Sequence, residues 1–161
     1  MTPDDLVEIE LIRQLKYRYV RFIDTKRWDD LAELFTEDVT ASYGGGATTL
    51  SGREPVMAYL SGAMADETML TSHKVHQPEI AITGPGAATG VWALDDVVIL
   101  GSLGMTVRGA SFYDDRYAKV GGAWRIAHTG YKRVYEEIEP RSADVKLTAS
   151  WWGTGGRSSL T

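Results

Sequence analysis

The chain has 161 residues, of which 43% are hydrophobic and 24% are charged, and its formal net charge is −5 at pH 7. This length and composition are typical of one globular domain, and no apolar run approaches the roughly 20 residues of a membrane span. The acidic balance argues against nucleic acid as a partner, because phosphates attract a basic surface. The chain has no cysteine, which excludes disulfides, thiolate metal sites and cysteine nucleophiles. The acidic stretch Met1–Asp5 lacks the basic and apolar start of a signal peptide, so we expect a cytoplasmic protein with no membrane partner.

The first half of the sequence predicts three helices. Apolar residues recur at steps of three and four, which predicts an amphipathic helix that starts after Pro3 and ends near Asp24. Shorter helices are predicted over residues 28–35 and 53–61, where apolar side chains again share one face. A short strand over residues 39–43 lies between them.

The second half is rich in β-branched and aromatic residues and is punctuated by glycine and proline, which predicts strands. Four long strands are expected over residues 71–82, 87–100, 105–120 and 123–135. Their short connections require antiparallel hairpins, so a strongly curved, mostly antiparallel sheet should wrap around the helices in an α+β fold. This domain covers residues 1–140. The tail over 141–161, with Trp151 and Trp152, is expected to cap a pocket or to contact a neighbouring subunit.

Only three histidines are available for acid–base chemistry or metal binding. His73 and His76 lie three residues apart on a predicted strand, so they should point to opposite faces of the sheet. A zinc site that adds His128 as a third ligand would need a helix there, so we expect no metal. His128 itself is interpreted as a structural or surface residue. His73 is either a satisfied core histidine or a general base.

Alternation along the later strands selects further candidates for the interior. One face carries Trp92, Leu94, Asp96 and Val98, and another carries Ser111, Tyr113, Asp115 and Tyr117. Each of the pairs Asp95-Asp96 and Asp114-Asp115 can place at most one carboxylate inward, and we expect most of the four to be solvated.

Several runs of the sequence resemble a known family when their order and spacing are taken together. They are Ile12–Phe35, Thr71–His73, Gly90–Trp92 and Gly121–Ile126. Over residues 5–135 the chain resembles the SnoaL-like family of the nuclear transport factor 2-like superfamily, which includes bile acid 7α-dehydratase, scytalone dehydratase and hexachlorocyclohexane dehydrochlorinase. The resemblance implies a cone-shaped α+β barrel, also called cystatin-like, and an enzyme that uses no cofactor.

The resemblance also implies roles for individual residues. Asp24 and His73 match the Asp–His dyad of the family, in which the carboxylate orients the imidazole. Tyr19 stands where the bile acid dehydratase has its catalytic tyrosine, and Tyr43 stands where scytalone dehydratase has one. Tyr113 matches a pocket position of scytalone dehydratase.

Two positions depart from the family enzymes, and four residues are predicted to bind the substrate. Trp92 replaces a second histidine of scytalone dehydratase, and Thr129 replaces an arginine of the dehydrochlorinase. Tyr17, two helical turns before Asp24, is placed on the same face of the first helix by its spacing. We therefore predict substrate-binding roles for Tyr113, Trp92, Tyr17 and His76. Core packing remains the alternative for each tyrosine.

These observations predict a lyase that removes water from a small hydrophobic polycyclic molecule, steroid-like or polyketide-like, that carries a hydroxyl group. His73 would take the proton, and Tyr19 or Tyr43 would stabilise the developing charge. Double-bond isomerisation of the ketosteroid isomerase kind, polyketide cyclisation and non-catalytic binding of a small molecule remain alternatives. The apolar run Val97–Leu100 and the two tail tryptophans predict a homo-oligomer, either a dimer or a trimer.

Overall fold

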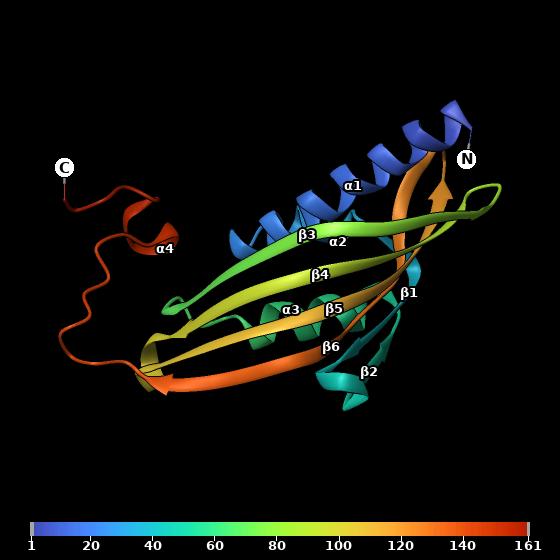
Figure 1. Cartoon of the computed structure of the whole chain (residues 1–161). Coiled ribbons are helices and arrows are strands. Elements are labelled where there is room, and N and C mark those ends of the chain that lie inside the picture. The colour runs from blue at the N-terminus through green and yellow to red at the C-terminus, as the bar shows by residue number, and fades with distance from the viewer. Residues whose placement is uncertain (1, 161) are drawn as a thin grey trace.

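The computed structural model describes residues 2–160 as helices at one end of the sequence and a large sheet that follows them (Figure 1). The helices are α1 (Pro3–Asp24), α2 (Trp28–Ala32), α3 (Arg53–Ala63) and α4 (Trp151–Thr154). The strands are β1 (Phe35–Tyr43), β2 (Thr48–Ser51), β3 (Met69–Gly84), β4 (Ala87–Leu100), β5 (Met105–Val120) and β6 (Ala123–Pro140). No helix within this described part is both long and apolar enough to cross a membrane.

The sheet is curved and open, with six strands in the order β2-β1-β6-β5-β4-β3. All neighbours are antiparallel except β1 and β6, which run parallel and pair Thr40 with His128. Helix α1 runs along β3, and α3 lies on the same side of the long strands (Figure 1). The predicted α+β architecture, with N-terminal helices in a curved sheet, is confirmed.

Helix α1 begins and ends where its local sequence requires. The Thr2 side chain accepts from the Asp5 backbone N–H, and the Asp5 carboxylate accepts from the Thr2 N–H, which together form a capping box. The apolar stripe of the helix is buried against the sheet at Ile12, Leu15, Tyr19, Phe22 and Ile23. The helix ends at Asp24, because Lys26 takes a left-handed backbone conformation with φ of 48°.

The predicted strands and helices agree with the structure except near β1. Strands β4 and β5 have the predicted bounds, whereas β3 and β6 extend further. The second helix was predicted to reach Phe35, but it stops at Ala32, because Phe35 is buried as a strand residue beside Ile126 of β6. Strand β2 was not predicted. Its four residues are too few to show alternation beside the glycine turn.

The tail after β6 has little regular structure, and it runs past the ends of β3 and β4 (Figure 1). Trp152 lies there, with its ring 5.0 Å from the ammonium of Lys26. The tail lines a separate cleft of about 370 Å³ together with the ends of β3 and β4.

Candidate active site

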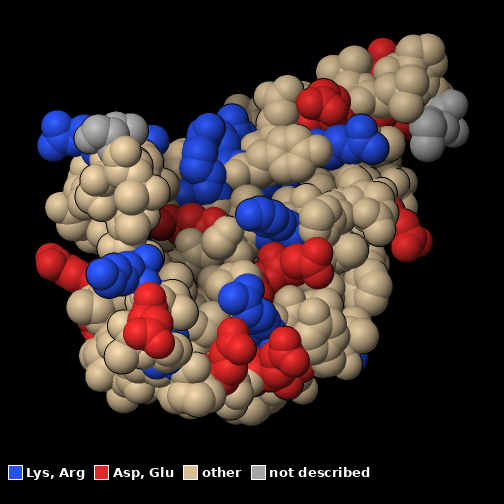
Figure 2. All heavy atoms as spheres, turned by 60° about the vertical axis from the view of Figure 1, so that its left-hand side comes forward, with Lys and Arg blue, Asp and Glu red and all other residues tan. Residues whose placement is uncertain are grey.

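A cavity of about 170 Å³ lies between α1, α3 and the inner face of the sheet. Its apolar wall includes Ile23, Leu60, Met64, Met69, Leu94 and Val98. Its polar groups include those of Tyr19, Tyr43, His73, Asp96, Tyr113 and Arg133. None of the described tail residues is among those that line this cavity. Acidic and basic residues are interspersed over the face of the molecule shown in Figure 2.

The end of α1 brings Asp24 to the start of β3, where it contacts three donors. Its Oδ1 lies 2.7 Å from Nδ1 of His73 and accepts the Thr71 hydroxyl at 2.8 Å. Its Oδ2 accepts the backbone N–H of His73 at 2.9 Å. A carboxylate bound at Nδ1 holds the proton on that nitrogen and leaves Nε2 as the acceptor. Because the ring lines the cavity, the pair offers a base to a bound molecule.

Five tyrosines line the cavity, and three of them, Tyr19, Tyr43 and Tyr113, are predicted site residues. Tyr19 packs edge-on against Tyr113 with ring centroids 6.1 Å apart, and Tyr43 stacks on Tyr59 at 5.2 Å. Burial raises the pKa of Tyr19, Tyr43 and Tyr113 well above the ordinary value, so all three phenols stay protonated as donors. The hydroxyl of Tyr43 is buried and makes no hydrogen bond of standard geometry with the described residues.

Arg133, which we did not predict, and the buried Asp96 form a second polar group in the cavity wall. Both terminal nitrogens of Arg133 donate to Asp96, and Nη1 also donates to the Ser111 hydroxyl at 3.1 Å. Gly109 makes room for the arginine, because a Cβ there would lie 2.5 Å from Nη1. Alternation on β6 requires one of the adjacent residues Lys132 and Arg133 to face inward, but the sequence does not say which.

A buried lysine lies next to the tyrosines and was also not predicted. Lys16 has no exposed side-chain surface, and its Nζ lies 2.7 Å from Oδ2 of Asp115. The signal for it is in the sequence, because Lys16 lies within the apolar stripe of α1, four residues after Ile12 and three before Tyr19.

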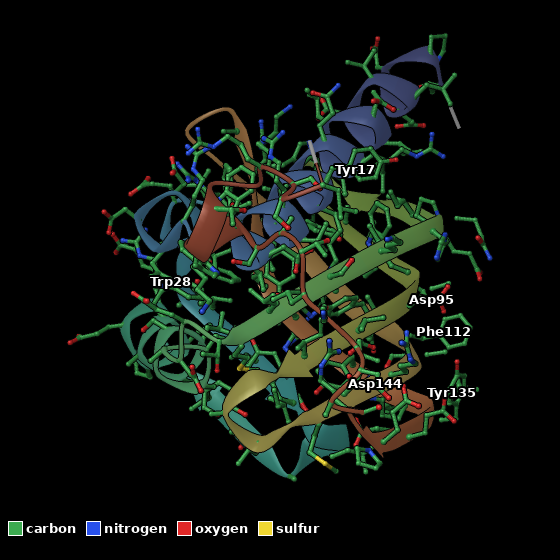
Figure 3. The ribbon with its side chains drawn as sticks, turned by 90° about the vertical axis from the view of Figure 1, so that its left-hand side faces the viewer. Tyr17, Trp28, Asp95, Phe112, Tyr135 and Asp144 are labelled. Carbon is green, nitrogen blue, oxygen red and sulfur yellow. The ribbon has the colours of Figure 1, made fainter. Side chains whose placement is uncertain are left out.

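Three residues that we predicted to bind substrate lie outside the cavity lining. Tyr17 is on the outer side of α1, where it is 47% exposed and packs edge-on against Trp92 (Figure 3). Trp92 is fully buried and donates its indole N–H to Tyr117, so it belongs to the core. His76 faces outward and pairs with Asp95 at 3.0 Å. These positions correct the predicted set of substrate-binding residues. Tyr17 lies two helical turns before Asp24, but this spacing does not place its side chain in the cavity lining.

The predicted sidedness of the strands is otherwise confirmed. His73 and His76 point to opposite faces, and one aspartate of each pair is inward. Asp96 and Asp115 are both buried, so two of the four carboxylates lie inside, whereas we expected most of the four to be solvated. His128 accepts or donates a 2.7 Å hydrogen bond with Thr40 outside the cavity. Within residues 2–160, no group of three or more His, Asp or Glu side chains could hold a metal ion.

The same architecture occurs in solved structures of a class of small α+β proteins. A scytalone dehydratase candidate from Novosphingobium aromaticivorans has a TM-score of 0.79 at 20% identity, covering 91% of this chain and 100% of that one. The hexachlorocyclohexane dehydrochlorinase LinA-type3 from Novosphingobium barchaimii has a TM-score of 0.76 at 16% identity, covering 91% and 98%. At such identities the likeness shows a common fold.

The family follows from the sequence match. The model of the SnoaL-like domain matches residues 4–130, so the chain belongs to the SnoaL-like family. An uncharacterized protein of Mycobacterium tuberculosis is 26% identical over 130 residues, which covers 79% of this chain and 86% of that protein. The family resemblance inferred from the sequence is therefore confirmed.

Proposed function

We propose that this chain is a lyase that works without a cofactor and removes water from a hydroxylated, hydrophobic ring compound. The observation that carries the proposal is the Asp24–His73 pair at the cavity wall, with Nδ1 bound to the carboxylate at 2.7 Å. The structural neighbours named as a dehydratase candidate and a dehydrochlorinase support an elimination. In an elimination a base takes a proton from one carbon while a group leaves the next.

The groups that line the cavity can accept and return every proton that the proposed reaction moves. Nε2 of His73 takes a proton from a carbon next to a carbonyl, and the C–H electrons form the new double bond as the hydroxyl leaves. The leaving oxygen receives a proton from the imidazolium and departs as water. Tyr19 or Tyr43 donates a hydrogen bond to the oxygen on which negative charge develops. Asp24 stabilises the imidazolium that forms between the two proton transfers.

The size and lining of the cavity support a small substrate with an apolar body. Its volume of about 170 Å³ is close to that of an engineered cavity of about 150 Å³ that binds benzene. We propose that one ring of a steroid-like or polyketide-like compound enters the cavity, while the rest of the molecule lies at its mouth. The ligand that we propose for this chain is thus a small hydrophobic molecule.

The test compares His73→Ala with His76→Ala, which removes the same side chain three residues further along the same strand. Both variants are assayed for loss of water from hydroxylated ring ketones, with mass spectrometry of the product. We expect His73→Ala to lose about 100-fold or more in rate, because a positioned base contributes that much. His76→Ala should keep the wild-type rate, because its side chain faces away from the cavity. Equal rates for all three proteins would contradict the proposal.

Isomerisation is the second candidate, because it uses the same base and the same phenols but has no leaving group. It is distinguished by a product of unchanged mass whose double bond has moved. A protein that binds ring compounds and turns none over would instead be a binding module.

A further inference from the structure

The rings of Tyr19 and Tyr113 form what we call the floor of the cavity. A charged pair that the proposed reaction does not use lies in contact with these rings. Lys16 of α1 and Asp115 of β5 are both fully buried, and their charged atoms are 2.7 Å apart. Replacing such a buried pair with apolar residues often leaves stability unchanged or improves it. The pair therefore calls for a role other than stability.

Asp115 is held in place by hydrogen bonds on both oxygens. Its Oδ1 accepts the Thr129 hydroxyl at 2.8 Å, and its Oδ2 accepts the Tyr117 hydroxyl at 2.7 Å. The Tyr117 oxygen in turn accepts the indole N–H of Trp92 at 2.8 Å. These donors stabilise the carboxylate as an anion, and the anion keeps the ammonium of Lys16 in one position.

The ammonium also contacts two of the phenol rings that line the cavity. Nζ of Lys16 lies 3.4 Å from the ring centroid of Tyr113 and 4.4 Å from that of Tyr19. A cation in contact with a ring draws electron density from it, and at a desolvated site this interaction is strong. The hydroxyl of such a ring becomes a stronger hydrogen-bond donor. Asp115 and burial both raise the pKa of Tyr113, so the phenol stays protonated while it donates.

We propose that Lys16 is a positioning residue that acts through the rings of Tyr113 and Tyr19 and makes the cavity floor a site for an oxyanion, such as a phenolate or an enolate. For catalysis this role rests on the function proposed above, in which an enolate-like oxygen develops. For binding it does not, because a phenolate can occupy the floor without any reaction. The ligand class is therefore a planar ring whose oxygen carries negative charge.

The experiment measures binding of a series of substituted phenols of similar size and different acidity, with anisole as the probe that cannot ionise. The test variant is Lys16→Met with Asp115→Asn, which removes both charges together and leaves neither one buried alone. The control is Lys119→Met with Glu8→Gln, because those residues also pair α1 with β5 at 2.7 Å but lie outside the cavity lining. Calorimetry gives the affinities, and circular dichroism checks the fold of each variant.

Wild type and the control pair should bind the more acidic phenols more tightly. The Lys16/Asp115 variant should lose this dependence, with about tenfold weaker binding of the most acidic phenol and unchanged binding of anisole. An unchanged dependence in a folded variant would overturn the proposal, because a structural pair would alter only stability. Should that variant not fold, Lys16→Gln with Asp115→Asn, which removes both charges but keeps a polar group at each position, takes its place, and the same loss supports the proposal while an unchanged dependence overturns it.

The same measurement separates this inference from the proposed function. His73→Ala should retain the dependence on phenol acidity, because it leaves the floor intact. A protein that shows the dependence but releases no water from any ring ketone would refute the lyase proposal and support the oxyanion site.

Discussion

The position of His73 depends on one carboxylate that serves several donors. Asp24 accepts from the imidazole, from the Thr71 hydroxyl and from the backbone of His73 itself. The backbone bond fixes the strand beneath the ring, and the imidazole bond fixes the ring. The orientation of the His73 imidazole is therefore set by a residue at the end of a helix.

Replacing Asp24 with asparagine tests this orientation. Asparagine can present an N–H to Nδ1, which would move the ring proton to Nε2 and remove the acceptor from the cavity. We expect the rate to fall on the order of 100-fold while the thermal midpoint changes little. Asp95→Asn is the matched control, because Asp95 pairs with the outward-facing His76. A rate loss fully explained by unfolding at the assay temperature would contradict this expectation.

The buried hydroxyl of Tyr43, which lies beside that of Tyr19 but makes no hydrogen bond of standard geometry, predicts opposite changes in stability and activity. A buried polar group that lacks a well-formed hydrogen bond costs about 1–3 kcal/mol, so Tyr43→Phe should raise the free energy of unfolding by about 1 kcal/mol. If that hydroxyl binds the substrate oxygen, the same variant should lose about tenfold or more in rate. Chemical denaturation and turnover are measured on the same preparation. A stable variant with full activity would assign the contact to Tyr19.

Residue types and spacing predicted part of this site. The Asp24–His73 contact and the inward Tyr19, Tyr43 and Tyr113 were expected, with family resemblance supplying the pairing. Arg133 could not be chosen over Lys132, because the inward register of β6 shifts at a bulge. Tyr17 was misplaced because helical spacing alone does not say which flank of a half-buried helix meets the cavity.

At the scale of elements, α1 is the part that the sequence defines best. Its apolar period is long, its capping box is local, and its end at Asp24 was expected. The short elements α2 and β2 were predicted poorly, because a run of four or five residues has too few positions to show a period. The antiparallel order of β3 to β6 was predicted from their short connections, but the place of β1 was not, because its pairing with β6 joins segments far apart in the chain.

Neighbouring residues of α1 offer a direct test of how this helix packs. Ile12 is fully buried and Leu11 is 43% exposed. Ile12→Ala should lower the free energy of unfolding by about 2–5 kcal/mol, because it leaves a cavity under the sheet. Leu11→Ala should change it by no more than about 0.5 kcal/mol. Urea titrations of both variants give the difference, and similar losses would mean that the helix is rotated from the position described.

For the whole molecule, the buried phenols predict instability in alkali. Burial raises the folded-state pKa of Tyr19, Tyr43, Tyr113 and Tyr117 well above 10.0. The unfolded chain releases these protons first, so their contribution to stability is complete below about pH 10 and is lost as the pH rises toward the folded values. Lys16 and Lys26 act in the opposite sense, because burial lowers the pKa of each below 10.5, but they are two groups against four. Unfolding midpoints measured from about pH 9 to about pH 11 should fall steeply.

The outer face of the sheet bears on assembly. Val91, Phe112 and Tyr135 are exposed there, and Figure 3 shows Phe112 and Tyr135 near Asp95 on one side of the molecule. Exposed apolar residues in such number favour association, so we propose a dimer or a trimer of identical chains. Analytical ultracentrifugation at micromolar concentration tests this, and Phe112→Glu should shift the mass toward the monomer. A wild-type monomer would refute the proposal.

The parallel pairing of β1 with β6 also sets the order in which the site can be completed. Thr40 pairs with His128, which lies 88 residues later in the chain. Strand β1 can therefore join β6 only after β6 has been synthesised. Asp24 and His73 are 49 residues apart and both precede β6, so they can meet before that strand is made, whereas β1 with Tyr43 can pair with β6 only afterwards. Contacts of such long range slow folding. The Asp24–His73 contact can therefore form before the cavity is complete, and a chain released before β6 is made would carry His73 with no complete cavity around it.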